Sequence, residues 1–320
     1  MAVRFTMINQ DSNDSAQPTN TVNTYTQGVN APGGPVEFFM CHWKGTWAAD
    51  PATGGFGNLI NTFRIVLNGE VVFDFRAGYA SNANEASIWQ YFLNSIGGRS
   101  YEDPSGTTTR DYWAAIPLGR QTPTGVNRYE IVIGYAAAAD AISTGTGTLE
   151  FWLQTNDAMQ KTTTVCPSTS FTHAASIEMV TVKVPQNVPG VVSALLVQND
   201  SAADQLGTQG IRLNALSDFG QEASMTRFLN GDWNNGIKFA GSALGTAQTL
   251  GYELPGAMVI PVYGLTGGDI IVTVDSSSAT TRTYTPIITN SVGAREAQTV
   301  RQTQAAPGNT ANAILSRTLE

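Results

Sequence analysis

Four short segments of this 320-residue chain recur in the same order in its two halves, and this repeat constrains the fold most. The spacing is kept as well, since Pro117 follows Asn68 by 49 residues and Pro261 follows Asn214 by 47. Each match alone is compatible with chance in a chain rich in Thr and Ile, whereas their shared order favours a tandem duplication. Its long period excludes solenoids and propellers, whose units run about 20 to 50 residues. The pairs are Ile65-Val-Leu-Asn68 and Ile211-Arg-Leu-Asn214; Glu85-Ala-Ser87 with Phe92-Leu-Asn94 and Glu222-Ala-Ser224 with Phe228-Leu-Asn230; Ile116-Pro-Leu118 and Ile260-Pro-Val262; Glu130-Ile-Val-Ile133 and Asp269-Ile-Ile-Val272.

Short apolar segments alternate with turn signals along both halves, which is typical of an all-β sandwich or barrel. Asn68-Gly69 tolerates the positive φ angles of a tight hairpin turn and predicts a hairpin there. We therefore expect two tandem jelly rolls, each an eight-stranded antiparallel β-sandwich with short helices in its loops. The predicted strands are 37–43, 62–67, 71–75, 112–118, 128–135, 148–155 and 176–184, followed by 191–197, 210–216, 237–240, 257–263, 269–274 and 280–289.

A helix is predicted over 85–96, because its apolar residues recur at helical spacing and Gly97-Gly98 follows it. The repeat predicts a matching helix near 222–230. The segment 183–190 carries two prolines and a glycine and is taken as the domain boundary. The expected domains are an N-terminal polar arm 1–35, a first jelly roll 36–185, a second jelly roll 186–290 and a C-terminal arm 291–320.

Charged residues are scarce, at 13% of the chain against about 25% in an average soluble domain. There are four lysines and 13 arginines, and the net charge is −8. The 42% hydrophobic content excludes disorder of the highly charged kind, and the acidic balance argues against nucleic-acid binding. Because lysines normally keep protein surfaces apart, their scarcity indicates a surface largely covered by other subunits.

Neither a secretory signal nor a membrane-spanning helix is expected. The first ten residues lack an apolar run of 7 to 15 residues, and no stretch approaches about 18 apolar residues. Cys41 and Cys166 allow one disulfide at most, and two buried free thiols in a reducing compartment are the preferred interpretation.

No catalytic, cofactor-binding or metal site is predicted. His42 stands between Cys41 and Trp43 and is interpreted as a core or interface histidine, since no second ligand pair has metal-site spacing. His173 lies near Cys166, but a Cys–His nucleophile needs a third orienting group and an oxyanion hole that the sequence does not mark.

Other polar motifs are interpreted as structural. The segments 145–147 and 232–236 are expected to be turns, Glu102-Asp103 a solvated loop, and Asp74 an outward side chain between Phe73 and Phe75. Two of the six tryptophans, Trp47 and Trp233, fall in loops and are the better candidates for stacking on sugars or bases. Core packing is expected for the rest, Trp43, Trp89, Trp113 and Trp152.

On these features the chain resembles the double jelly-roll major capsid proteins of the adenovirus and tailless membrane-containing bacteriophage lineage. The resemblance covers most of 36–290 and rests on two fused sandwiches, matched helices at 85–96 and near 222–230, a polar N-terminal arm and few charges. In size the chain is most similar to compact phage versions, such as that of a lipid-containing Flavobacterium phage.

The resemblance implies a structural subunit without enzymatic activity or cofactor. Three copies would form a pseudo-hexagonal capsomer, and capsomers an icosahedral shell. The implied partners are further copies of the chain, minor capsid or vertex proteins and an internal membrane beneath the shell, without direct sequence-specific binding of nucleic acid. The implied location is the virion, after synthesis in the host cytoplasm. Two alternatives stay open: a carbohydrate-binding tandem β-sandwich, lectin-like or glycan-active, and a trimeric phage receptor-binding or tail protein.

Overall fold

A computed structural model describes most of the two predicted β regions. The expectations for Trp47, Trp233, the turn 232–236, the strand 237–240 and the helix near 222–230 lie outside the described residues, as does nearly all of the predicted C-terminal arm. The described residues are 3–13, 16–19, 22–46, 56–77, 88–102, 109–136, 147–159, 161–186, 188, 190–200, 206–215, 257–265 and 269–291.

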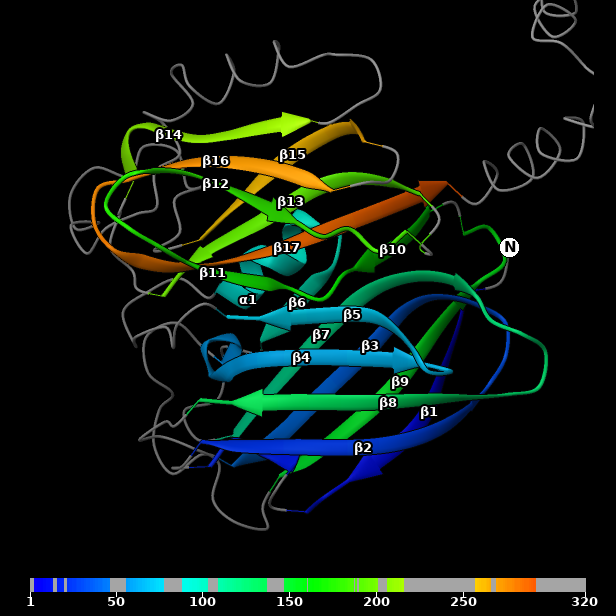
Figure 1. Ribbon diagram of the computed structural model, residues 1–320. Helices are drawn as coiled ribbons and strands as arrows, with labels where there is room; N and C mark the ends of the chain where they lie inside the picture. The colour runs from blue at the N-terminus through cyan, green and yellow to red at the C-terminus, as the bar shows by residue number, and fades with distance from the viewer. Residues whose placement is uncertain are drawn as a thin grey trace, which may run out of the picture.

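The first unit is a sandwich of two antiparallel sheets (Figure 1). In strands with one face on the core and one face outward, every second side chain is apolar and points into the core. The side chains between them point outward, as in any half-buried strand. The five-stranded sheet has the order β1 (Val3–Asp11), β9 (Thr148–Asn156), β3 (Pro35–Thr46), β7 (Thr109–Gln121), β6 (Arg99–Glu102). The four-stranded sheet has the order β2 (Asn23–Pro32), β8 (Val126–Tyr135), β4 (Ile60–Leu67), β5 (Glu70–Arg76).

The second unit lies above the first in Figure 1 and is built in the same way. One sheet has the order β10 (Lys161–Val165), β17 (Thr280–Ser291), β13 (Val191–Asn199), β15 (Ala257–Leu265), and β11 (Thr169–His173) also pairs with β17. The other has the order β12 (Ile177–Val182), β16 (Ile270–Ser276), β14 (Leu206–Ala215).

The strand orders of the two units coincide. Replacing β1, β9, β3 and β7 by β10, β17, β13 and β15 converts one five-stranded order into its counterpart, apart from the extra β6. Replacing β2, β8 and β4 by β12, β16 and β14 does the same for the second sheet, apart from the extra β5. This winding is that of a jelly roll, so the chain is a tandem double jelly roll, as predicted.

The sequence repeat follows this correspondence. Ile65 and Ile211 lie in the counterparts β4 and β14, and Ile116 and Ile260 lie in β7 and β15. The fourth pair falls on β8 and on the start of β16. Three of the four matches therefore lie on topologically equivalent strands, while the match at 222–230 lies outside the described residues.

The prediction of a polar N-terminal arm over 1–35 is wrong. β1 pairs with β9 and β2 pairs with β8, so both strands belong to the first sandwich. The reason is a one-sided pattern in β2, where Tyr25, Val29 and Ala31 are buried while the intervening side chains are polar. Because most residues of β2 are polar, the sequence pattern did not predict this strand.

The predicted boundary at 185/186 also disagrees with the strand pairing. β10, β11 and β12 precede it, yet they pair with β17 and β16 of the second unit. The proline-rich segment 183–190 thus connects two strands of one unit. We propose that the first jelly roll ends at about residue 159 and the second begins at β10; β10 went unrecognised because its sequence is mostly threonine.

The helix α1 (Ile88–Ser95) confirms the prediction over 88–95, and the short 3-10 helix η2 (Phe56–Leu59) lies near it. Trp89, Phe92 and Leu93 of α1 are buried in the first core, where Trp89 Nε1 donates a 3.0 Å hydrogen bond to the Tyr112 hydroxyl. The predicted hairpin between β4 and β5 is confirmed, with positive φ at Asn68 and Gly69. No helix within the described ranges is long and apolar enough to cross a membrane.

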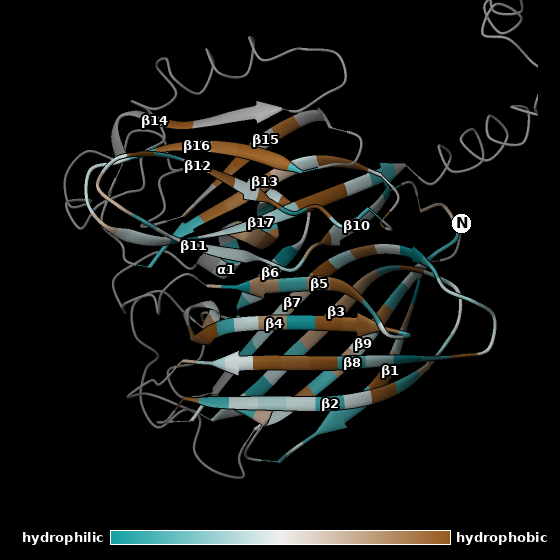
Figure 2. Cartoon of the chain, in the orientation of Figure 1, coloured by the Kyte–Doolittle hydropathy of each residue, from teal (hydrophilic) through white to brown (hydrophobic). Residues whose placement is uncertain are grey.

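The two units are joined through apolar side chains. Figure 2 shows apolar stretches in the strands of both units. Four residues of the second unit pack into the hydrophobic cluster of the first: Val165, Leu196, Ala257 and Ile287. They lie on the outer face of the β10-β17-β13-β15 sheet, because their strand neighbours Leu195, Val197 and Ile288 point into the second core. Helix α1 contacts β15 at this junction.

Candidate interaction surface

The outer face of the first unit's five-stranded sheet carries a row of large side chains. In β9, Leu149, Phe151 and Leu153 point into the core, so Trp152 points outward. The register sets Met7 of β1 and Met40 of β3 opposite Trp152. Residues directly opposite one another share a face of the sheet. A second row, Phe5, Gln154 and Phe38, lies beside it.

Several apolar side chains on this outer face are exposed. Val3, Phe5, Met7 and Tyr101 retain 49%, 59%, 46% and 61% of their accessible surface. Contiguous exposed apolar side chains on a soluble protein mark an interaction site more often than a free surface. We call this set of residues, together with Met40, Trp113 and Trp152, the outer patch.

His42 forms the polar centre of the patch. Its Nδ1 lies 3.0 Å from Glu150 Oε2 and its Nε2 lies 3.1 Å from Asp111 Oδ1. The imidazole ring stacks on the Trp113 indole, with ring centroids 3.9 Å apart and planes 8° from parallel. Because both ring nitrogens contact carboxylates, His42 of β3 connects β9, through Glu150, and β7, through Asp111. It lies on the outer face of the sheet and not in the core, so the core alternative is wrong and the interface alternative stays a prediction.

Glu150 is the second anchor of this cluster. Desolvation by burial raises the pKa of its carboxyl, but hydrogen bonds from His42 and from Trp152 outweigh it and bring the pKa below the usual value. The Trp152 indole Nε1 donates to Glu150 Oε2 over 3.0 Å. The ionised carboxylate therefore orients both an imidazole and an indole on the surface. Among the described residues, no group of three or more His, Cys, Asp and Glu is arranged to hold a metal ion.

The fold has counterparts among solved virus structures. A chain from the atomic structure of Sulfolobus Turreted Icosahedral Virus is similar with a TM-score of 0.55 and 10% identity, over 90% of each chain. The likeness is one of fold. Two further similarities are weaker: the major capsid protein P2 of bacteriophage PM2, with a TM-score of 0.48 and 12% identity over 91% of this chain and 98% of that one, and the PBCV-1 virus capsid, with 0.45 and 8% over 91% and 94%. No protein-family model and no curated protein sequence matches the chain.

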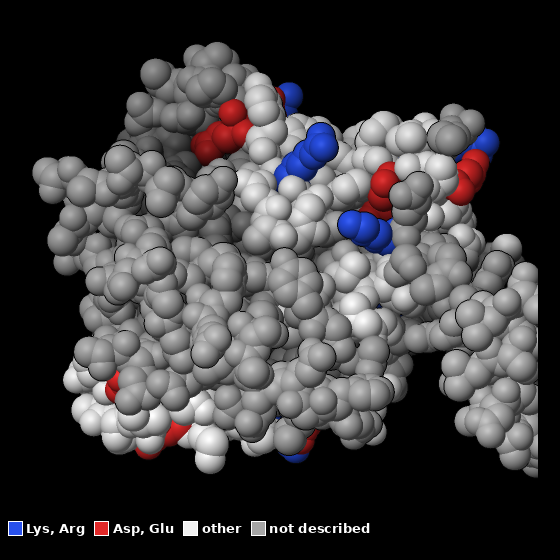
Figure 3. Space-filling model, turned by 90° about the horizontal axis from the view of Figure 1, so that it is seen from above, with Lys and Arg blue, Asp and Glu red and all other residues white. Residues whose placement is uncertain are grey.

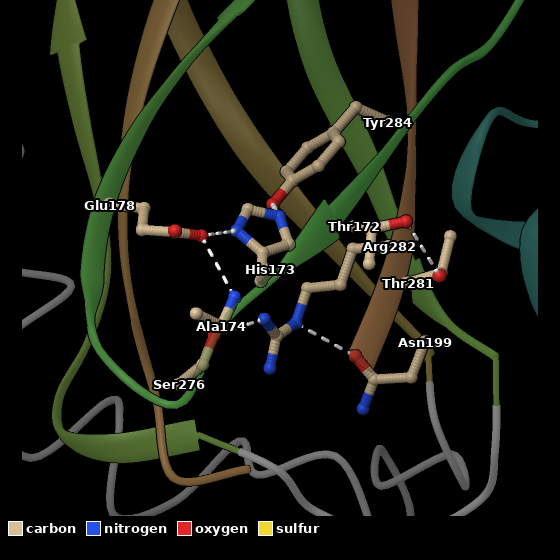
Figure 4. A network of polar contacts seen from close by, with 9 residues as sticks. All are labelled: Thr172, His173, Ala174, Glu178, Asn199, Ser276, Thr281, Arg282 and Tyr284. Carbon is tan, nitrogen blue, oxygen red and sulfur yellow. Dashed lines mark hydrogen bonds and ion pairs between the residues drawn. The ribbon is translucent and has the colours of Figure 1, made fainter. Parts of the chain in front are cut away.

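In the second jelly roll, His173 belongs to a buried polar network (Figure 4). Its Nδ1 lies 3.1 Å from Glu178 Oε2, and its Nε2 lies 3.0 Å from the Tyr284 hydroxyl. Beside it, Arg282 is fully buried and donates to Asn199 Oδ1 over 2.9 Å and to Ser276 Oγ over 2.6 Å. The network links β11, β12, β13, β16 and β17 at one end of the sandwich.

This geometry offers no Cys–His nucleophile. Both nitrogens of His173 are engaged by Glu178 and Tyr284. Cys166 is fully buried, and burial raises the pKa of its thiol to about 12, so the thiolate is not formed at neutral pH. Cys41 is also buried, burial raises the pKa of its thiol well above the ordinary value, and both cysteines are free thiols.

Two acidic residues of the first jelly roll occupy defined places. Asp74 lies on the opposite face of β5 from Phe73 and Phe75, as predicted, but its side chain is buried and lies 3.6 Å from Arg64. Burial raises its pKa, against the opposing effect of that arginine. The prediction that Glu102 is in a solvated loop is wrong, because it ends β6 and its carboxylate accepts a 3.1 Å hydrogen bond from the Phe56 backbone.

The tryptophans divide between the core and the outer patch. Trp43 and Trp89 are buried, as predicted. Trp113 and Trp152 face outward and are partly exposed, so the expectation of core packing is wrong for these two. Trp113 stands between the buried Tyr112 and Ala114, and adjacent residues of a strand point to opposite faces, so its indole lies on the outer face.

The described surface of the second jelly roll carries few charges. Seen from above in Figure 3, the described part of this surface shows a few basic and acidic side chains among uncharged ones.

Proposed function

We propose that this protein is a viral major capsid protein, a structural subunit without catalytic activity. One observation carries the proposal: two jelly rolls of the same topology in one chain, one of which leaves an apolar sheet face exposed. Two like units per chain allow three copies to build a six-unit ring with a pseudo-hexagonal outline. The fold likeness to a chain of Sulfolobus Turreted Icosahedral Virus supports this role.

The proposal extends to the particle. Capsomers of this kind would tile an icosahedral shell in the virion, after synthesis in the host cytoplasm. Minor capsid or vertex proteins would occupy the five-fold positions, and an internal membrane would lie beneath. The compact chain of 320 residues supports a particle like that of a lipid-containing Flavobacterium phage.

Native mass spectrometry and electron microscopy of the purified full chain test the proposal. We expect particles of three chains, each 34.0 kDa, with a hexagonal outline, and closed shells at high concentration. Single-chain particles that build no shell at any concentration would refute it. A glycan array on the same sample serves as the comparison, since selective glycan binding by a single chain would favour the lectin-like alternative.

A further inference from the structure

The connection between β11 and β12 carries the chain from one sheet of the second jelly roll to the other. β11 pairs with β17 in the first of these sheets, and β12 pairs with β16 at the edge of the second. We call residues 169–182 the β11–β12 corner. It contributes little to the second core, because Val182 is buried but Phe171 and Val180 are only partly buried. Segments that bury few apolar side chains open locally at a low cost in free energy.

A histidine and a carboxylate close the corner (Figure 4). His173 ends β11, its side chain is fully buried, and its Nδ1 lies 3.1 Å from Glu178 Oε2 of β12. The same carboxylate oxygen accepts a 3.2 Å hydrogen bond from the Ala174 backbone N–H. The Ser276 backbone N–H donates to the Ser176 carbonyl over 3.1 Å, which ties the connection to β16. The turn of the corner is thus held by polar contacts, and two of them converge on the partner of one imidazole.

The surroundings of His173 disfavour a second proton on its ring. The Tyr284 hydroxyl of β17 lies 3.0 Å from Nε2 and donates to it when the imidazole is neutral. Protonation turns Nε2 into a donor, so the hydroxyl hydrogen loses this acceptor. The buried Arg282 of β17 repels the added charge, whereas Glu178 attracts it. Burial and Arg282 outweigh Glu178, and the pKa of His173 lies below its ordinary value.

The other acidic groups at this end of the sandwich have different places. Asp200, which follows β13, accepts hydrogen bonds from the Thr280 hydroxyl and the Thr281 backbone N–H. Asp275 of β16 pairs with the exposed Ile177 and lies on the opposite face of its strand from the buried Val274. Glu178 is therefore the carboxylate that contacts the ring.

The first jelly roll builds the equivalent corner without a histidine. Asp11 ends β1 and pairs with Leu149 near the start of β9, just as His173 ends β11 and pairs with Thr280 at the start of β17. There the Tyr25 hydroxyl of β2 donates to Asp11 Oδ2 over 2.9 Å. Histidine is the side chain whose ordinary pKa brings its charge change between pH 5 and pH 8. Mild acid should therefore act on the second corner and leave the first intact.

We propose that the β11–β12 corner is an acid-sensitive latch, in which protonation of His173 releases β11 and β12 from the second sandwich while the first jelly roll stays closed. Once the corner opens, the imidazole reaches water and moves away from Arg282. Between the folded pKa of His173 and the ordinary value of 6.5, the open form binds more protons than the closed form. Opening therefore becomes easier as the pH falls through this range. The inference concerns a single chain and does not depend on the proposed function.

Hydrogen–deuterium exchange of the full chain tests the latch. It is read by mass spectrometry between pH 7 and pH 5, with correction for the intrinsic exchange rates. We expect the protection factors of peptides from the corner to fall about tenfold, within the limit of about tenfold per pH unit that uptake of one proton allows. Peptides from β1 and β2 of the first jelly roll are the internal reference and should keep their protection.

Two glutamine variants assign the effect to one residue. A glutamine can donate to Glu178 and accept from Tyr284, as the neutral imidazole does, but it takes up no proton. His173→Gln should therefore make the protection of the corner independent of pH. His42→Gln is the matched control, because it replaces the other histidine of the chain, which lies on β3 in the first jelly roll. It should keep the tenfold change.

The wild-type chain decides first. Equal losses of protection in the corner and in β1 and β2, or no loss in the corner, overturn the latch, and this comparison needs no variant. Circular dichroism at pH 7 shows whether each variant is folded. A folded His173→Gln with an unchanged response to acid, or a folded His42→Gln without one, shows that another group is the trigger and also overturns it.

Discussion

His173 shows how one buried residue sets the protonation state of its surroundings. In the neutral imidazole one proton arrangement satisfies both contacts: Nδ1–H donates to the Glu178 carboxylate, and Nε2 accepts from the Tyr284 hydroxyl. Burial lowers the pKa of His173, the nearby positive charge of Arg282 lowers it further, and Glu178 opposes both only in part. The folded chain therefore holds this imidazole neutral.

This predicts a loss of stability in acid. Between the folded pKa of His173 and the ordinary value of 6.5 the unfolded chain binds more protons. The stabilising contribution is thus complete above pH 6.5 and is lost as the pH falls through the folded pKa, with a slope of at most about 1.4 kcal/mol per pH unit. Urea unfolding between pH 7 and pH 4 measures the slope.

The variant His173→Gln is the reference for this experiment. It removes the titrating group and costs about 1–3 kcal/mol at pH 7, because Glu178 and Tyr284 lose a matched partner. Its unfolding free energy should fall less steeply with acid than that of the wild type. Identical slopes would show that His173 does not titrate differently in the folded and unfolded chain.

At the junction of the two jelly rolls, strand β7 meets β10 through a glycine. Gly119 has a φ of +57°, and a Cβ at this position would lie 1.6 Å from the Lys161 carbonyl oxygen. Beyond it, Arg120 lies 3.4 Å from Glu70 of β5. Only a residue without a side chain lets the backbones of β7 and β10 approach this closely. The close contact between these two strands therefore requires glycine at position 119.

We therefore expect Gly119→Ala to lower the unfolding free energy by about 2–5 kcal/mol, from the left-handed backbone and the overlap together. The matched control is Gly69→Ala in the β4–β5 hairpin, with a φ of +85° and open space around the added methyl group. It should cost only about 1–2 kcal/mol. Differential scanning calorimetry of both variants decides, and equal losses would contradict a tight junction.

At the scale of the whole molecule, the low content of charged residues limits the kinds of contact that copies of the chain can form. With 13% charged residues and four lysines, contacts between copies must be largely apolar and neutral-polar. Such contacts are not screened by ions, unlike pairs of exposed charges. Sulfate, which is excluded from protein surfaces, strengthens apolar burial.

The proposed trimer should consequently keep its mass between 50 mM and 1 M NaCl, and sodium sulfate should raise its midpoint of thermal dissociation. Light scattering across this salt series provides the measurement. An association constant that falls more than about tenfold by 1 M NaCl would indicate that charge pairs hold the copies together.

The sequence by itself predicted the helices and strands whose buried apolar side chains recur at a regular spacing. The hairpin at Asn68-Gly69, the helix over 88–95 and most strands of both units follow from local alternation and turn chemistry. The order of the repeated segments predicted the double jelly roll, because similar segments at similar spacing in both halves indicate a duplicated unit. Strands with mostly polar outer faces or many threonines, β2 and β10, escaped, since their few buried residues give a weak pattern.

Only the tertiary structure decided which strands pair and which faces are covered. β10 precedes the predicted boundary but pairs with β17, more than 100 residues later in the chain, and no local signal encodes that choice. Likewise Trp113 and Trp152 differ from Trp43 only in the side of the sheet that they occupy. The side depends on what packs against the sheet. The outer patch of the first jelly roll is exposed, whereas the corresponding face of the second jelly roll packs against the first.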